Sequence, residues 1–269
     1  MTKIVKVLMA SLFAVLLSVS FTSCDKEPME ARPELPPMET ILMDFSDFSE
    51  APAGAKSTDA TYENFLHSFL TLTFWNLAST VTMAVPVAAY GYALQQEPVY
   101  LGDLTWEWSF EFDVQGASYN ATLTGSRLNN EEFTMEMVIG SASSEAGVKW
   151  FDGVVRYDHT HATWKIYEEG TVEILQVEWN KDFVTEESDL RYTYVEPDQN
   201  ETGSYIQYSY MPEQVYDASF DISHSGGTTD IEWNLATREG RVMDSVKFGD
   251  SEWHCWDSDE NGLADIDCP

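Results

Sequence analysis

Residues 104–112 read LTWEWSFEF, so that Leu, Trp and Phe side chains alternate with Thr, Glu and Ser. A period of two is typical of a β-strand that has one face on an apolar core and the other in water. The same alternation returns at 119–123 and again at 133–139. Together these three segments predict the start of a β-sheet.

The period of two continues as far as residue 248, accompanied by turn signals. The further strands expected are 147–157, 161–168, 171–180, 189–196, 203–211, 215–223, 228–236 and 240–248. The turn signals are Asn129-Asn130, Asp152-Gly153, Glu169-Gly170, Gly226-Gly227 and Glu239-Gly240. Short strands joined by tight turns predict an antiparallel meander of about eleven strands, in which sequence neighbours pair. A sheet of that size curls strongly.

A helical pattern covers residues 59–96. From Asn64 to Gln96 the chain has no Asp, Glu, Lys or Arg. The apolar residues with helical spacing are Phe65, Leu66, Phe69, Leu70, Phe74, Leu77, Val81 and Val85. Pro86 is expected to kink or restart the helix. A buried core helix is the favoured interpretation, and a membrane span is the alternative because a segment of this length can cross a bilayer.

The same periodicities predict the extent and the architecture of the folded domain. Residues 39–48 (ETILMDFSDF) predict a first strand with Ile41, Met43 and Phe45 on one face, and residues 49–58 predict a loop. We therefore expect one mainly β domain (α+β) over residues 39–254. Its antiparallel β-meander would be curved or barrelled around the 59–96 helix, which needs cover on most sides.

Charge excludes two classes of function. The chain has 269 residues, with 46 Asp and Glu against 14 Lys and Arg, and a net charge of −32. Binding to nucleic acid requires a basic face, and docking on anionic lipid requires a polybasic patch. The content of 43% hydrophobic and 13% aromatic residues predicts a folded core rather than disorder throughout.

The first residues predict export. Lys3 and Lys6 precede an apolar stretch over 7–19, and small polar residues lead to Cys24. This arrangement is typical of a secretory signal and is too short for a stable membrane helix. We therefore expect a signal peptide at residues 1–23 rather than a membrane span.

The sequence FTSC at 21–24 resembles a bacterial lipobox, although Phe21 replaces the usual Leu. The resemblance implies that residues 1–23 are removed and that Cys24 carries lipid, which would hold the protein on a membrane. A plain signal peptide with an incidental cysteine is the alternative interpretation.

Residues 25–28 (DKEP) resemble the acidic tether of surface-exported lipoproteins of the Bacteroidota, and the chain resembles small cell-envelope lipoproteins of that group. This implies a location on the outer membrane, facing the periplasm or the cell surface. The proline-rich residues 24–38 predict an extended spacer.

The C-terminal segment carries a candidate metal site. Asp257, Asp259 and Asn261 have the spacing of the first ligands of a calcium loop, and Gly262 stands where such a loop turns sharply. The segment resembles thrombospondin type 3 calcium loops, which implies a structural calcium ion. The implied ligands are Asp257, Asp259, Asn261, the Leu263 carbonyl, Asp265 and Asp267. Asp267 would replace the bidentate Glu of an EF-hand, because Cys268 stands at that position. The alternative is a solvated acidic tail.

Cys255 and Cys268 bracket this segment. Once Cys24 carries lipid, they are the two remaining cysteines in an oxidising compartment. We therefore predict a disulfide that closes residues 255–269 into an acidic tail. A metal site formed by both thiolates and His254 is the alternative.

Other chemical signals are sparse. His159 and His161 would share a face of an extended segment and suit a transition metal, although a polar turn is favoured. His67 is expected to be a hydrogen-bonded core residue. Core positions, rather than a surface for stacking on sugars or the lining of a lipid cavity, are expected for Trp106, Trp108, Trp150, Trp164, Trp179 and Trp233. The sequence has no nucleophile elbow, HExxH pair, P-loop or GxGxxG.

These features predict a non-catalytic, lipid-anchored protein of the cell envelope that binds or carries an apolar molecule or a glycan. One alternative is a structural or interaction subunit of a surface complex. Another is an extracellular hydrolase, which would need a carboxylate of raised pKa in a polar cleft. The expected partners are the membrane, through the anchor, and a small molecule, glycan or protein, but not nucleic acid. Calcium is the one cofactor expected.

Overall fold

The computed structural model describes residues 32–49, 61–114, 116–141, 147–168, 170–259 and 262–269. Residues Pro33–Pro269 form one compact unit, described here by itself. The signal segment 1–23, Cys24, most of the spacer and the 50–58 part of the expected loop lie outside the described residues. The predictions made for them therefore stay predictions.

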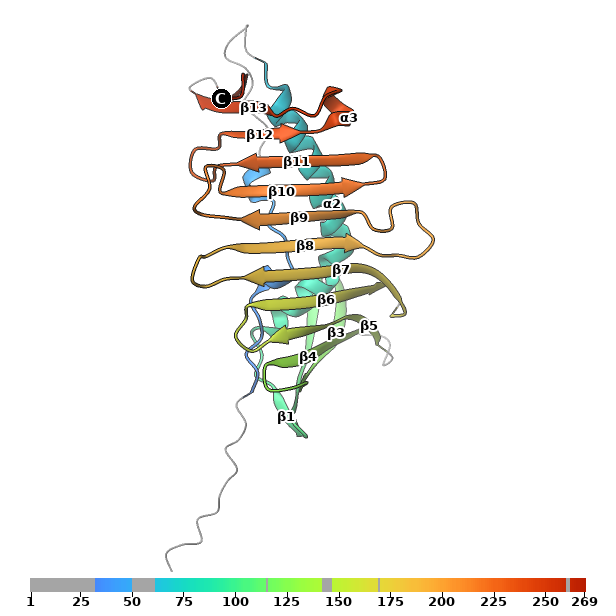
Figure 1. The fold of residues 1–269 in the computed structure, drawn as a ribbon. Coiled ribbons are helices and arrows are strands. Elements are labelled where there is room, and N and C mark those ends of the chain that lie inside the picture. Colours follow the sequence, from blue (N-terminus) through green and yellow to red (C-terminus); the bar gives the residue numbers. More distant parts are fainter. Residues whose placement is uncertain (1–31, 50–60, 115, 142–146, 169, 260–261) are drawn as a thin grey trace, which may run out of the picture. The chain divides into compact units, whose positions relative to one another are not determined.

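The unit is built on one antiparallel sheet (Figure 1). In the described part of the chain the sheet has 14 strands, and each strand pairs with its neighbours in the sequence. The strands are β1 (Val99–Gly102), β2 (Thr105–Val114), β3 (Ala117–Arg127), β4 (Glu132–Ser141), β5 (Val148–Arg156), β6 (His161–Glu168), β7 (Val172–Lys181), β8 (Ser188–Tyr194), β9 (Tyr205–Tyr210), β10 (Ala218–His224), β11 (Gly227–Trp233), β12 (Gly240–Met243), β13 (His254–Asp259) and β14 (Gly262–Ile266).

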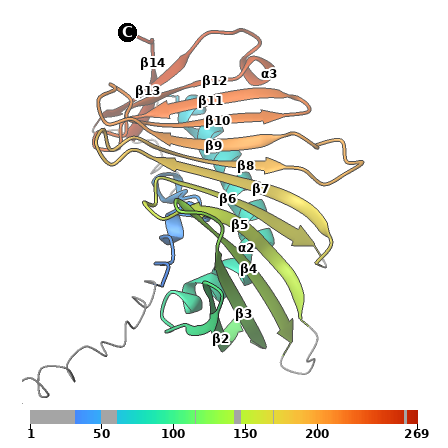
Figure 2. The same cartoon turned by 60° about the horizontal axis from the view of Figure 1, so that its bottom comes forward.

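The predicted antiparallel meander is confirmed, but the predicted strand number and barrel are wrong. Among the described residues β1 and β14 are the two edges and do not pair, so the sheet stays open. Its strands bend around the face that carries the long helix (Figure 2). The sequence did not predict β1, because its residues are largely exposed at an edge and show no alternation of burial. It did not predict β13 and β14, because their acidic residues were interpreted as a loop.

The expected turn at Asp152-Gly153 is also wrong, because both residues lie inside β5. Gly153 is needed for packing in this strand, because there is no room for a side chain. A Cβ atom at this position would lie 2.3 Å from the Thr163 carbonyl oxygen and 2.4 Å from the Trp164 ring. The glycine therefore lets the Trp164 indole lie flat across the neighbouring strand.

The helix α2 (Glu63–Ala93) confirms the helical pattern, and it runs through Pro86 without a restart. It crosses the strands on one face of the sheet (Figure 1). Its buried residues are Asn64, Phe65, Ser68, Leu72, Met83, Pro86, Ala89, Tyr90 and Ala93. Tyr90 packs edge-on against Phe151 and Trp164, with ring centroids 6.1 and 5.9 Å away. By length and composition α2 is also the one described helix that could cross a membrane.

The expectation that the sheet covers α2 on most sides is wrong. Five apolar side chains on the opposite face, named here the outer stripe, are between 40% and 74% exposed: Leu66, Leu70, Phe74, Leu77 and Val81. Their spacing of three and four residues places them on one side of the helix. Apolar composition predicted the helix, but it does not show which side the rest of the chain covers.

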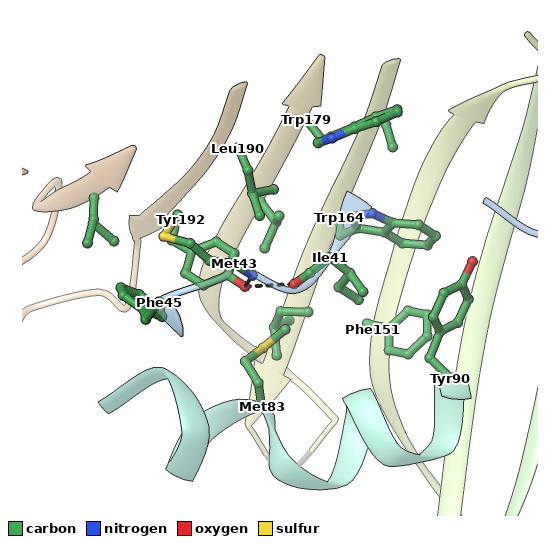
Figure 3. Packing of buried hydrophobic residues seen from close by; sticks show 14 of the residues in the cluster. Ile41, Met43, Phe45, Met83, Tyr90, Phe151, Trp164, Trp179, Leu190 and Tyr192 are labelled. Atoms are coloured by element: carbon green, nitrogen blue, oxygen red, sulfur yellow. Dashed lines mark hydrogen bonds between the residues drawn. The ribbon is translucent and has the colours of Figure 1, made fainter. Parts of the chain in front are cut away.

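Residues 33–48, named here the strap, lie between α2 and the sheet (Figure 3). The predicted strand over 39–48 is wrong, because this segment contains only two short 3₁₀ turns, η1 (Met38–Thr40) and η2 (Ser46–Phe48). The predicted apolar face is nevertheless confirmed, since Ile41, Met43 and Phe45 are all buried. The strap packs as an extended layer without joining the sheet.

Aromatic side chains bond to the strap backbone in place of a neighbouring strand. The Tyr192 hydroxyl donates to the Ile41 carbonyl and accepts from the Met43 N–H, both at 2.8 Å. Trp164 Nε1 donates to the Thr40 carbonyl at 3.0 Å, and the Tyr90 hydroxyl donates to the Pro36 carbonyl at 2.6 Å. Buried backbone groups need such partners, because an unpaired buried amide or carbonyl is costly.

The C-terminal hairpin holds the start of α2. Tyr62, at the N-cap position, makes no capping bond with its own side chain. Instead, the two carboxylate oxygens of Asp265 accept from the backbone N–H groups of Glu63 and Asn64, each at 3.0 Å. The Asn64 side chain in turn donates to the Cys255 carbonyl at 2.8 Å. The predicted disulfide is present, joining Cys255 to Cys268.

The bonds between Tyr192 and the strap give a first prediction. Tyr192→Phe leaves the Ile41 carbonyl and the Met43 N–H buried without this partner, so the free energy of unfolding should fall by about 1–3 kcal/mol. Chemical denaturation followed by tryptophan fluorescence measures the loss. The matched control is Tyr205→Phe, because the half-buried Tyr205 hydroxyl donates to Asp221 and water can replace that bond. Equal losses in both variants would contradict the role given to Tyr192.

The remote cap of α2 gives a second prediction. Asp265→Ala should destabilise the protein by about 0.5–2 kcal/mol, as expected for loss of a helix cap. Thermal unfolding followed by circular dichroism reports the change. Asp267→Ala removes the same charge from an exposed residue two positions away and should have little effect. A loss as large for Asp267→Ala would show that net charge, rather than capping, explains the result.

Candidate functional site

The strap fills the space between α2 and the sheet on one side only. On the other side a cleft of about 1120 Å³ opens between the middle of α2 and one row of strand ends in the sheet. The sheet wall of the cleft comes from the ends of β6, β8, β10 and β12 and from the starts of β7 and β11. These ends and starts lie on the same side of the sheet. Neighbouring antiparallel strands alternate in direction, so these ends come together although they are distant in the sequence.

One wall of the cleft is apolar. Leu70, Phe74 and Trp75 project from α2 opposite Ile174 and Leu175 of β7. Leu70 and Phe74 also belong to the outer stripe, with 56% and 66% of their side chains exposed. The apolar lining therefore continues from the cleft onto the open surface of the helix.

A hydrogen-bonded cluster closes the end of the cleft nearest the start of α2. His67 Nε2 lies 2.8 Å from Asp244 Oδ2, and the Thr229 hydroxyl donates to the same oxygen at 2.9 Å. Asp244 Oδ1 accepts from the N–H groups of Val246 and Lys247, which caps the short helix α3 (Ser245–Phe248). His67 therefore has a hydrogen-bonded partner, as predicted, but it stands at the cleft wall rather than in the core.

The bonds to Asp244 set its acidity. Burial raises the pKa of the Asp244 carboxyl, but the Lys247 N–H, His67 and Thr229 outweigh that effect and hold its pKa below the usual value. The carboxylate is therefore ionised at neutral pH while it orients His67. It is a positioning group in the cleft wall.

The loop between β8 and β9 forms the rim of the cleft and carries more carboxylates. Glu196 accepts from the Tyr194 hydroxyl, a bond that raises the pKa of Tyr194 to about 12. Glu201 accepts from the side chains of Ser225 and Ser204, and these bonds, with the Ser225 N–H, lower the pKa of Glu201. Among the described residues that line the cleft there is neither Lys nor Arg, and the lining carboxylates are Glu168, Glu196, Glu201 and Asp244.

Of the residues predicted to bind calcium, Asp257, Leu263 and Asp265 lie in the strands of the β13–β14 hairpin. Asp257 pairs with Ala264 and Trp256 pairs with Asp265, so Asp257 and Asp265 point to opposite faces. Asp265 is engaged with the amides of α2. Asn261 and the Asp259 side chain lie outside the described residues, Leu263 is buried in the hairpin, and Asp267 is exposed beyond it. No group of three His, Cys, Asp or Glu residues that could hold a metal is found within the described residues, and calcium binding stays a prediction.

The paired histidines have separate partners. His159 Nε2 lies 3.3 Å from the Glu34 carbonyl oxygen in the strap, and His161 Nδ1 lies 2.7 Å from Asn180 Oδ1 on β7. His159 stands in a turn with a positive φ of 52°, in agreement with the favoured polar turn. His254 Nε2 bonds to Asp250, and its neighbour Cys255 is in the disulfide.

The tryptophans are mostly core, as predicted. Trp106, Trp108, Trp164, Trp179 and Trp233 are buried, and Trp150 packs partly buried against the same core. The rim at Glu196 and Glu201 and the exposed lining of α2 were not predicted from the sequence. The exposed lining of α2 did have a signal in the sequence, because apolar residues occupy more of the helix than one buried stripe requires.

No family model matches the chain, and neither the curated proteins nor the solved structures offer a match. Functional inference therefore rests on the geometry of the cleft.

The Asp244 cluster gives a third prediction. A carboxyl whose pKa is lowered by folding stabilises the protein above its unfolded-state pKa, and this contribution is lost as the pH falls through its lowered folded-state pKa. Asp244→Asn should therefore lower the free energy of unfolding at pH 7 and make it less dependent on pH below about 4. Urea denaturation at a series of pH values measures this. An unchanged acid dependence in the variant would contradict the assignment.

Proposed function

We propose that this chain is a non-catalytic binding or carrier protein of the cell envelope, which holds the apolar part of a ligand between α2 and the sheet. The observation that carries the proposal is the cleft of about 1120 Å³ with its apolar helix wall left open. Its volume is slightly larger than the usual range for small-molecule sites, about 300–1,000 Å³. A helix whose only role was to fill the core would have its large apolar side chains covered.

An apolar ligand fits this lining better than a glycan does. Leu70, Phe74 and Trp75 would lose contact with water when a hydrocarbon chain lay against them, at a gain of about 25 cal/mol for each Å² buried. Of the tryptophans that were candidates for stacking on sugars, all but the partly buried Trp150 lie in the core. We therefore favour a ligand with a long apolar part.

The proposal includes attachment to the outer membrane. Cys24 in its lipobox-like sequence and the proline-rich spacer over 24–38 support it, since acylation would hold the unit at a membrane from which it could take its ligand. Calcium bound to the C-terminal hairpin would have a structural role, because its predicted ligands among the described residues do not line the cleft.

A structural or interaction role is the second candidate function. Leu66, Leu77 and Val81 of the outer stripe are exposed but do not line the cleft, so they offer a separate apolar contact for a protein partner. The third candidate, hydrolysis, has less support. The pKa values of Asp244 and Glu201 are lowered, whereas a general acid needs a raised one. Burial raises the pKa values of Asp47 and Asp230, but these residues do not line the cleft.

Binding of the environment-sensitive probe N-phenyl-1-naphthylamine tests the proposed function. The wild-type chain should bind the probe with increased fluorescence. Ala78→Trp places an indole in the cleft from the middle of α2 and should weaken binding at least about tenfold, which corresponds to 1.4 kcal/mol. Leu77→Trp is the matched control, since it adds an indole at the next residue, outside the cleft. Absence of probe binding to the wild type, or equal loss in both variants, would contradict the proposal.

Native mass spectrometry of the protein purified from its own envelope complements the probe. A discrete extra mass that is lost on denaturation would support a bound ligand, and its identity would name the class. A second run under denaturing conditions reports the mass of any lipid on Cys24, with Cys24→Ser as the unlipidated control. Bare protein in every preparation would favour the interaction role.

A further inference from the structure

The charge of the cleft is one-sided. Glu168, Glu196, Glu201 and Asp244 line it, and within the described ranges none of them forms an ion pair with Lys or Arg. The bonds of Glu196, Glu201 and Asp244 come from the hydroxyls of Tyr194, Ser204, Ser225 and Thr229, the Gln199 amide and backbone N–H groups. Two histidines are near these groups: His67 bonds to Asp244, and His224 acts on Glu201 through its charge. The hydroxyl and amide bonds orient Glu196, Glu201 and Asp244 and bring no charge of opposite sign to them.

The acidic and apolar parts of the lining are separate. The acidic rim, Glu196 and Glu201, lies on the loop that follows β8, which Figure 1 shows extending beyond the edge of the sheet. The apolar side chains Leu70, Phe74 and Trp75 lie along α2. A ligand with its tail against the helix would therefore present its polar head to the two rim carboxylates.

We propose that the ligand is an amphiphile with a single long apolar tail and an ammonium head group. This inference rests on the proposed function, because it concerns the same cleft. The ammonium head donates hydrogen bonds to Glu196 and Glu201 and forms ion pairs with them. The tail covers the exposed part of the α2 wall. A fatty acid or another anionic amphiphile is disfavoured, because its charged head would meet carboxylates and, among the described lining residues, neither Lys nor Arg.

The negative charge of the whole protein is the competing explanation for any preference for cations. The chain carries −32, and this field attracts every cation. Long-range attraction weakens within about 8–10 Å at physiological salt, whereas contact with the rim carboxylates is screened less. The test therefore compares carboxylates removed from the cleft with the same number removed elsewhere.

The experiment is displacement of N-phenyl-1-naphthylamine by decylammonium, 1-decanol and decanoate, at pH 7.5 and 0.15 M salt and below micelle formation. The three competitors share a ten-carbon tail and differ in head charge. Decylammonium should displace the probe at a concentration at least about tenfold lower than decanoate, with decanol between them.

Variants of the chain test which carboxylates cause the preference for the cationic competitor. Glu196→Gln with Glu201→Gln should reduce the preference for decylammonium over decanoate at least about fivefold. The matched control is Glu213→Gln with Glu239→Gln, which should keep the preference. It removes two exposed carboxylates from the β9–β10 and β11–β12 loops, at the other ends of the strands from the cleft. If the first pair does not fold, as judged by circular dichroism, the single variant Glu168→Gln tests the same lining and should reduce the preference about twofold.

The outcomes separate the two proposals. If neither the probe nor any competitor binds, the proposed function fails. If the probe binds but decanoate competes as well as decylammonium, the cleft is a ligand site and the inference about the head group is overturned. If both double variants reduce the preference equally, overall charge explains the selectivity and the inference is also overturned.

Discussion

The structure depends on a backbone segment that buries alternate side chains against the core without belonging to the sheet. The strap, residues 33–48, brings polar amides and carbonyls between two apolar layers, where each needs a partner. Tyr192, Trp164 and Tyr90 supply these partners from β8, β6 and α2, so the aromatic core also anchors the chain. Because the strap occupies the space on one side, α2 approaches β2 at one end and β12–β14 at the other, and the cleft remains between them.

The helix is thus held at its ends while its middle forms a wall. Near its C-terminus Tyr90 packs against Phe151 and Trp164. At its N-terminus Asp265 caps it from a hairpin closed by the disulfide. Closing a loop of about 14 residues stabilises a fold by roughly 3 kcal/mol in the chain-entropy model, so the C-terminal hairpin is a firm support for a helix that the sheet covers only in part. Rigid ends and an open middle are consistent with a preformed binding site.

The sheet could be predicted from the sequence because nearly every strand has one buried and one wetter face. The segment 161–168 has the predicted boundaries. The strap could not be predicted, because Ile41, Met43 and Phe45 alternate in the same way whether or not the backbone joins a ladder. The exposure of Leu70 and Phe74 could not be predicted either, since it depends on what the strap leaves uncovered. The lining of the cleft comes from many elements, and its residues have no common motif.

The distance along the chain between α2 and its cap has a consequence for biogenesis. Asp265 follows Glu63 by 202 residues. During synthesis from the N-terminus, the apolar helix emerges before any described strand that can cover Phe65 or Leu72, and its cap is made only after all the strands from β1 to β13. The nascent chain therefore carries an exposed apolar segment while the sheet is being made, and cellular chaperones would have to shield it until the β13–β14 hairpin forms.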